Sequence, residues 1–170
     1  DQDLQLESIG YSQVEMLTSG KIDAAVIYVA NEPIQLKLLG YDTDVIRVSD
    51  SISMIGNGLI TNEKTLKENP DLVKRMTAAL VKSIEYTEAN PDEAYEICKK
   101  YVDNLENADN QELQKQVMIE SIALYKDTDN RKTGVSSADA WTNMSDVMKR
   151  MGLIQESVDP NNAYTNEFVE

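Results

Sequence analysis

An unbroken apolar run from Ala24 to Val29 most constrains the fold of this chain. The run has the length of a strand and does not alternate with polar residues, which is typical of a parallel strand covered on both faces. Pro33 suits the first position of a helix that follows the run. Because ligands of open α/β sheets bind beyond the carboxyl ends of parallel strands, the candidate binding residues at this end are Tyr28, Asn31 and Glu32.

A second predicted strand precedes the run and contains Leu4, Leu6 and Ile9. Residues 12–15 have the form of a capping box, so we expect a helix to begin at Ser12. The order strand, helix, strand favours a parallel crossover, which would bring Tyr11 and Ser12 to the same edge of the sheet as Tyr28. The amides of this helix start can receive a polar or anionic ligand group, although Ser12 can equally be a simple cap.

The next segments continue the predicted alternation of helices and strands. Residues 34–39 predict a short helix, and residues 45–48 and 55–61 predict two more strands. Asn57 lies between two glycines in the last of these. Glycine inside a strand marks either the close approach of a ligand or an ordinary bulge. We therefore add Asn57 to the candidate binding residues and leave both interpretations open.

From Asn62 onward the pattern becomes helical. A short helix is expected over residues 65–68. Longer helices are expected after Asn69-Pro70, after Asn90-Pro91, over residues 111–125 and from near Ser136. Cys98 shares a predicted helix face with Ala94 and Tyr101, which predicts a buried thiol that reacts slowly. The fold class predicted from these patterns is α/β, with a helix-rich C-terminal half.

Composition excludes several classes of function. The 170 residues include no histidine and one cysteine, which removes Ser-His-Asp and Cys-His catalysis, histidine-based metal sites and an internal disulfide. The net charge of −14 argues against partners such as nucleic acid or anionic membrane surfaces. Residues 127–130 begin like a calcium loop, but Arg131 and Lys132 occupy ligand positions. We therefore expect no metal site.

An ordered set of short motifs resembles a known family. Gly10-Tyr11 is followed by Val14-Glu15-Met16-Leu17-Thr18-Ser19-Gly20-Lys21-Ile22-Asp23-Ala24-Ala25, and the pattern continues through residues 31–33, 58–64, 68–73, 90–94, 151–153 and 163–168. These residues resemble the substrate-binding proteins of bacterial ABC importers. Within them, the chain is most similar to the group that binds the pyrimidine precursor of thiamine and is related to a pyrimidine synthase.

The resemblance implies part of a two-lobed periplasmic-binding-protein fold of type II. Residues 1–48 would be the later part of lobe two, residues 49–54 a hinge crossover, and residues 55–170 the return to lobe one with a helical extension. The N-terminal half of the family's fold would be absent, so the chain is expected to associate with itself or with a clipped N-terminal fragment. The implied location is extracytoplasmic, in the periplasm or anchored by lipid at the outer face of the cytoplasmic membrane.

The resemblance also implies a small-molecule ligand, delivery to the permease subunits of an ABC importer, no cofactor and no enzymatic activity. We expect a heterocyclic vitamin or precursor of the thiamine-pyrimidine or riboflavin class, because no Lys or Arg lies in the loops that contain Tyr11 and Tyr28. The alternatives are an aliphatic sulfonate or taurine ligand, an enzyme like the pyrimidine synthase, and a helical interaction module without a small-molecule site.

Overall fold

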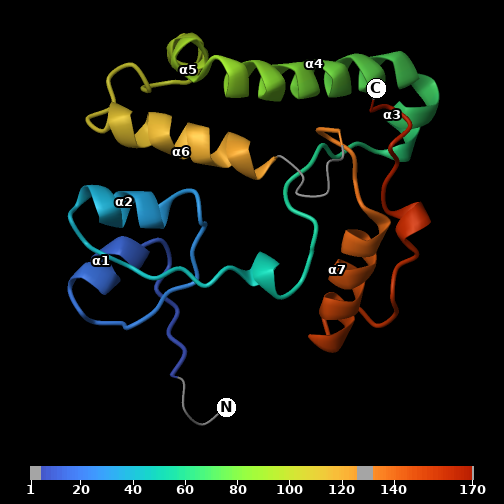
Figure 1. Ribbon diagram of the computed structural model, residues 1–170. Coiled ribbons are helices and arrows are strands. Elements are labelled where there is room, and N and C mark those ends of the chain that lie inside the picture. The colour runs from blue at the N-terminus through green and yellow to red at the C-terminus, as the bar shows by residue number, and fades with distance from the viewer. Residues whose placement is uncertain (1–4, 126–131, 170) are drawn as a thin grey trace.

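The computed structural model describes residues 5–125 and 132–169, and these residues form helices joined by long loops (Figure 1). The α-helices in chain order are α1 (Gln13–Thr18), α2 (Glu32–Leu38), α3 (Glu63–Glu68), α4 (Pro70–Ala89), α5 (Pro91–Lys99), α6 (Gln111–Leu124) and α7 (Ala138–Arg150). In addition, single turns of 3₁₀ helix span Val48–Asp50 and Pro160–Asn162.

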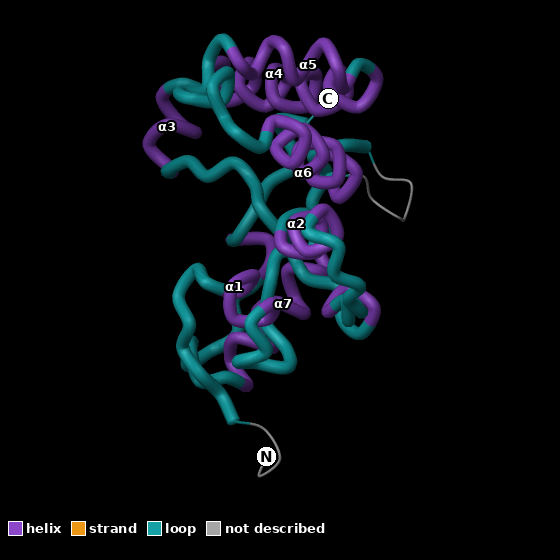
Figure 2. Tube along the Cα trace, turned by 90° about the vertical axis from the view of Figure 1, so that its left-hand side faces the viewer, coloured by secondary structure: helices purple, strands orange, loops and turns teal. Residues whose placement is uncertain are grey.

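The helices form an upper layer and two lower groups. Helix α4 spans the top of the molecule and contacts α3, α5 and α6, and α5 also contacts α6. Below this layer, α2 packs against α6 and α1 packs against α2. Helix α7 contacts the 3₁₀ turn at residues 160–162 and stands apart from the other helices in Figure 1, whereas it overlaps α1 in the turned view of Figure 2. The result is an elongated arrangement in which α2 and α6 join the N-terminal group to the upper layer.

The predicted helices are confirmed, because their start signals act locally. The Asn62 side chain accepts a hydrogen bond from the Thr65 amide at the start of α3, and Ser137 accepts one from the Ala140 amide at the start of α7. Proline occupies the first position of both α4 and α5, where its missing N–H costs nothing. Each signal needs only its own first turn to be satisfied.

The C-terminal tail folds back onto the start of α7. The Asn166 side chain accepts from the Ser136 amide at 2.8 Å and donates to the Ser136 carbonyl at 3.0 Å. The ring of Tyr164 stacks on Trp141, with ring centroids 5.4 Å apart and planes 6° apart. The two hydrogen bonds join residues 30 positions apart, and the ring stack strengthens the same attachment of the tail to α7.

The predicted strands are not found in residues 5–125 and 132–169. The segments 24–29 and 55–61 have no regular secondary structure, and the predicted strand at 45–48 runs instead into the 3₁₀ turn at Val48. A strand exists only through hydrogen bonds to a neighbouring strand, and no described residue makes such backbone hydrogen bonds to residues 24–27 or 55–61. The α/β class therefore remains a prediction here, while the helix-rich C-terminal half is confirmed.

The core of the described chain is small. The buried apolar residues are Ala30, Leu36, Ala94, Tyr95 and Ala140. The accessible surface is 13454 Å², whereas a folded monomer of this mass exposes about 8,400 Å². The structure therefore leaves much of its apolar surface uncovered.

The predicted face of α5 is only partly correct. Ala94 is buried and Cys98 is half-buried, but Tyr101 is 82% exposed because it lies beyond the end of the helix. The side chain that fills the interior is Tyr95, which the sequence analysis did not single out. Separately, no helix of the described residues is long and apolar enough to cross a membrane.

Candidate functional site

Three of the six predicted site residues come together in one loop, at the start of α2. Glu32 is buried, and its Oε2 accepts a hydrogen bond from the Tyr28 amide at 3.0 Å. Its Oε1 accepts from Asn31 Nδ2 at 3.4 Å. The carboxylate therefore closes the loop between residues 28 and 32 on itself, which is the usual way a buried polar group is satisfied.

Asn31 is fixed from the other side by a residue that the sequence analysis missed. Gln35 Nε2 donates to Asn31 Oδ1 at 2.9 Å, from one helical turn further along α2. The signal was the four-residue spacing of two amide side chains at a helix start, which places them on the same face. The orientation of the Asn31 side chain is therefore fixed by its hydrogen bonds to Glu32 and Gln35.

The tyrosine of this loop behaves differently from its neighbours. The Tyr28 side chain is 78% exposed while its backbone amide is held by Glu32. A fixed backbone that presents an uncovered aromatic ring is suited to stacking on a planar ligand. No basic residue lies between Tyr28 and Pro33, so the loop offers amide donors and an apolar ring rather than positive charge.

The other three predicted residues are not brought into this loop. Tyr11 is fully exposed, and the Ser12 hydroxyl donates to the Ile9 carbonyl at 2.6 Å instead of capping α1. Asn57 is exposed in an irregular segment. Helices α1 and α2 are in contact, yet among the described residues no hydrogen bond or ring contact joins the Tyr11 loop to the Tyr28 loop.

Two hollows on the surface lie elsewhere. A hollow of about 490 Å³ separates α7 from the Ile52 region, where Asn143 Nδ2 donates to the Ser53 carbonyl at 2.9 Å. A smaller one of about 250 Å³ lies between α5 and α6. Neither contains any of the six predicted residues.

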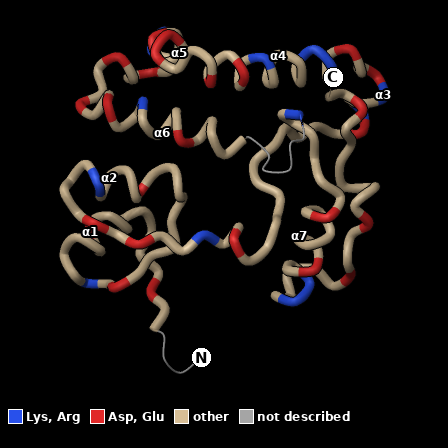
Figure 3. The backbone as a smooth tube through the Cα atoms, in the orientation of Figure 1, with Lys and Arg blue, Asp and Glu red and all other residues tan. Residues whose placement is uncertain are grey.

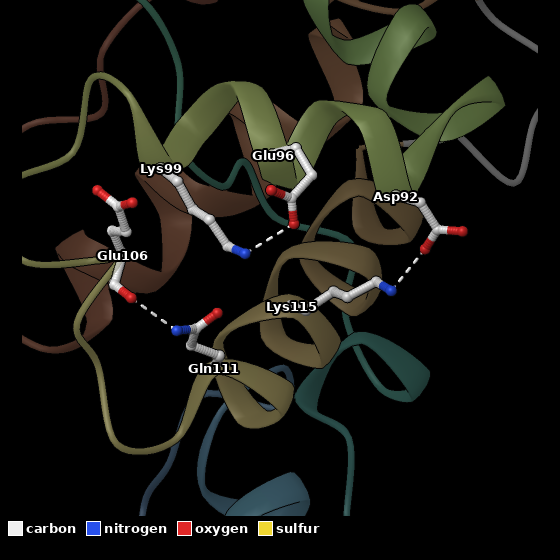
Figure 4. A network of polar contacts seen from close by, with 6 residues as sticks. All are labelled: Asp92, Glu96, Lys99, Glu106, Gln111 and Lys115. Carbon is white, nitrogen blue, oxygen red and sulfur yellow. Dashed lines mark hydrogen bonds and ion pairs between the residues drawn. The ribbon is translucent and has the colours of Figure 1, made fainter.

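The smaller hollow is bordered by a polar network that ties α5 to α6 (Figure 4). Lys115 pairs with Asp92 across the two helices, and Lys99 pairs with Glu96 within α5 at 2.7 Å. The hydrogen bond to Asp92 raises the pKa of Lys115 above its usual value. Gln111 Nε2 donates to the Glu106 carbonyl and fixes the loop before α6. Of these three contacts, the pair between Lys115 and Asp92 is the one that joins α5 to α6.

Charge is distributed over the whole molecule rather than concentrated at one site. Figure 3 shows acidic residues in the upper layer and in both lower groups, with fewer basic residues among them. Within residues 5–125 and 132–169, no group of histidine, cysteine and acidic side chains could hold a metal ion. The calcium-like residues 127–130, with Arg131, lie outside the described residues, as does Leu4 of the first predicted strand.

Comparison of the sequence with known protein families identifies the family of the chain that contains the loop at residues 28–32. A family model described as NMT1/THI5 like matches residues 1–94 of the chain. The chain belongs to the NMT1/THI5-like family. All six predicted site residues fall inside the matched region of this NMT1/THI5-like protein. The resemblance to substrate-binding proteins is thereby confirmed, and family membership implies a periplasmic-binding-protein fold.

A curated relative extends this NMT1/THI5-like assignment to the rest of the chain. The riboflavin-binding protein RibY of Chloroflexus aurantiacus is 31% identical over 169 residues, which cover 98% of this chain and 48% of the relative. The chain therefore spans about half the length of that relative. No solved structure matches significantly. The relationship supports a solute-binding role for this NMT1/THI5-like chain.

Proposed function

We propose that this chain is part of the solute-binding component of an ABC importer, and that its ligand is a heterocyclic vitamin or precursor of the riboflavin class. The observation that carries the proposal is the similarity of nearly the whole chain to a protein named for riboflavin binding. The family name alone fits a thiamine precursor equally well, so the relative is what favours a flavin.

The loop at the start of α2 supports this ligand class. Tyr28 offers an uncovered ring for stacking, and Asn31 offers an amide whose orientation is set by Gln35 and Glu32. An isoalloxazine or pyrimidine ring is planar with polar edges, which these two groups match. A sulfonate instead requires cations or several convergent amides, and the loop contains no Lys or Arg.

The other proposed residues contribute from neighbouring segments. Tyr11, Ser12 and Asn57 would join the site on closure of two lobes, in which residues 1–48 form part of lobe two and residues 55–170 part of lobe one. The bond from Asn143 to the Ser53 carbonyl supports residues 49–54 as the crossover, because it anchors that segment on α7. Closure around a ligand between lobes is the usual behaviour of such two-lobed proteins.

We further propose that the protein acts outside the cytoplasm, delivers its ligand to permease subunits and has no enzymatic activity. The relative supports the last point, because it is named for binding rather than for turnover. The competing enzymatic hypothesis, a pyrimidine synthase, predicts that a pyrimidine product accumulates in single-turnover reactions. Chromatography of such reactions distinguishes the two, since a binding protein returns its ligand unchanged.

The direct test is a titration of the intact gene product with riboflavin, followed by quenching of flavin fluorescence. We expect a dissociation constant of about 1 μM or below, roughly −8 kcal/mol. The thiamine pyrimidine and taurine serve as competitors of the two alternative classes. Failure of riboflavin to bind, or release of bound riboflavin by an equal concentration of taurine, seen as recovery of flavin fluorescence, would contradict the proposed ligand class.

A further inference from the structure

The larger surface hollow is assembled from three segments that lie far apart in the sequence. Its volume is about 490 Å³, and its lining residues come from α7, from the loop before α3 and from the loop after α7, which runs back beside the helix (Figure 1). The Asn143 side chain donates to the Ser53 carbonyl at 2.9 Å, and the Ser145 hydroxyl accepts from the Val158 amide at 2.8 Å. Both loops are therefore fixed to α7, around a hollow with the volume of a small-molecule site.

Two neighbouring cations, Lys149 and Arg150 in the last turn of α7, line this hollow. Neither forms an ion pair with any described residue. Asp146 precedes them at the spacing of helical ion pairs and also lines the hollow, but it is not paired with either cation. The hollow therefore has an excess of positive charge, in a chain whose net charge is −14.

The end of α7 does not need these two side chains for capping. Basic residues are common in the last turn of a helix because they interact with its free carbonyls. Here the last carbonyls of α7 already accept hydrogen bonds from the backbone amides of residues 151–153. Gly152 has a φ of +73°, which is typical of a helix end closed in this way. The charged groups of Lys149 and Arg150 are therefore available to a ligand.

We propose that this hollow is a second small-molecule site, separate from the loop at residues 28–32, and that its ligand is a phosphate monoester with hydroxyl groups. Such an ester is nearly a dianion at neutral pH, which matches two adjacent cations, whereas a carboxylate or sulfonate carries a single charge. Arg150 presents paired donors to phosphate oxygens, and Lys149 adds a compact positive charge. Asp146 and Ser157 can accept hydrogen bonds from ligand hydroxyl groups.

The test is a calorimetric titration of the intact gene product with glycerol 3-phosphate at low ionic strength and neutral pH. Glycerate keeps the vicinal hydroxyl groups but has a monoanionic carboxylate, and inorganic phosphate lacks the hydroxyl groups. We expect glycerol 3-phosphate to bind about tenfold more tightly than either, because only the ester combines both features. Absence of binding, or equal binding of glycerol 3-phosphate and either comparison ligand, would overturn the proposal.

Substitutions at the end of α7 locate the site. Lys149→Met and Arg150→Met should each weaken binding of glycerol 3-phosphate about tenfold. Lys82→Met, the matched control, removes an equal charge from an exposed position on α4 and should bind the ester as wild type does. An equal loss in all three variants would show that net charge attracts the ester. An unchanged affinity in all three would place the ester elsewhere, and either result would overturn the proposal.

Riboflavin binding separates this inference from the proposed function. Riboflavin carries no phosphate, so Lys149→Met and Arg150→Met should bind it as wild type does. Weaker riboflavin binding in these two variants would show that the hollow belongs to the riboflavin site, and the inference of a separate site would be wrong while the proposed function stands. Failure of riboflavin to bind wild type would contradict the proposed function and leave the result with glycerol 3-phosphate unaffected.

Discussion

At the scale of single residues, Glu32 stabilises the loop that presents the ring of Tyr28. Replacing it with alanine removes the acceptor of the Tyr28 amide and one support of Asn31. We expect Glu32→Ala to lower the free energy of unfolding by about 1–3 kcal/mol, the cost of leaving a partly buried donor unpaired. Glu32→Gln retains a carbonyl acceptor and should cost less, and the exposed Glu15→Ala should cost nothing measurable. Chemical denaturation of the three variants checks this ordering.

Tyr28 has the opposite character, because its exposed side chain contributes little to the fold. We expect Tyr28→Ala to weaken riboflavin binding by about 1–3 kcal/mol, the scale of a lost aromatic contact with its buried area, and to leave the melting temperature of the free protein unchanged. Tyr101→Ala is the matched control, since this tyrosine is also exposed but lies beyond α5. Equal affinity of both variants and wild type in calorimetric titrations would place the ligand elsewhere.

At the scale of elements, the helices could be predicted from sequence and the strands could not. Asn62, Ser137 and the prolines before α4 and α5 act within a single turn, so their positions alone indicated where helices begin. The run at residues 24–29 carries an equally clear strand pattern, but a strand also needs a neighbour that the described chain does not contain. Asn31 and Glu32 remain predicted site residues, and the contact of Gln35 with Asn31 was signalled by their four-residue spacing, which the sequence analysis did not use.

The docked tail gives a prediction with its own optical signal. Asn166→Ala removes both hydrogen bonds to Ser136, so the stack of Tyr164 on Trp141 should loosen. Because Trp141 is the one tryptophan of the chain, its emission should shift to longer wavelength and the unfolding free energy should fall by about 1–3 kcal/mol. Asn161→Ala loses only the bond from its side-chain amide to Asp159 and keeps the one from its backbone N–H, so it should leave the emission unchanged.

The ion pair between α5 and α6 predicts a pH dependence. The hydrogen bond from Lys115 to Asp92 raises the pKa of Lys115 in the folded state above 10.5, its unperturbed value. The contribution of this pair to stability is therefore fully present below pH 10.5. It is lost as the pH rises through the pKa that Lys115 has in the folded state. Lys115→Met should therefore flatten the alkaline part of the stability profile. Lys64→Met, which removes an ion pair within α3, should leave that part as in wild type.

At the scale of the whole molecule, the proposed function and the uncovered surface concern the same part of the chain. Val26 lies two residues before Tyr28 and is 96% exposed, so the candidate ligand site borders uncovered apolar surface. The two hollows described above lie elsewhere, one beside α7 and one between α5 and α6.

The most direct measurement is amide hydrogen exchange of the intact gene product with and without saturating riboflavin. The account predicts that riboflavin slows exchange at residues 28–35 at least tenfold, with no change along α7. Binding of riboflavin without protection of residues 28–35, or no binding at all, would contradict the account.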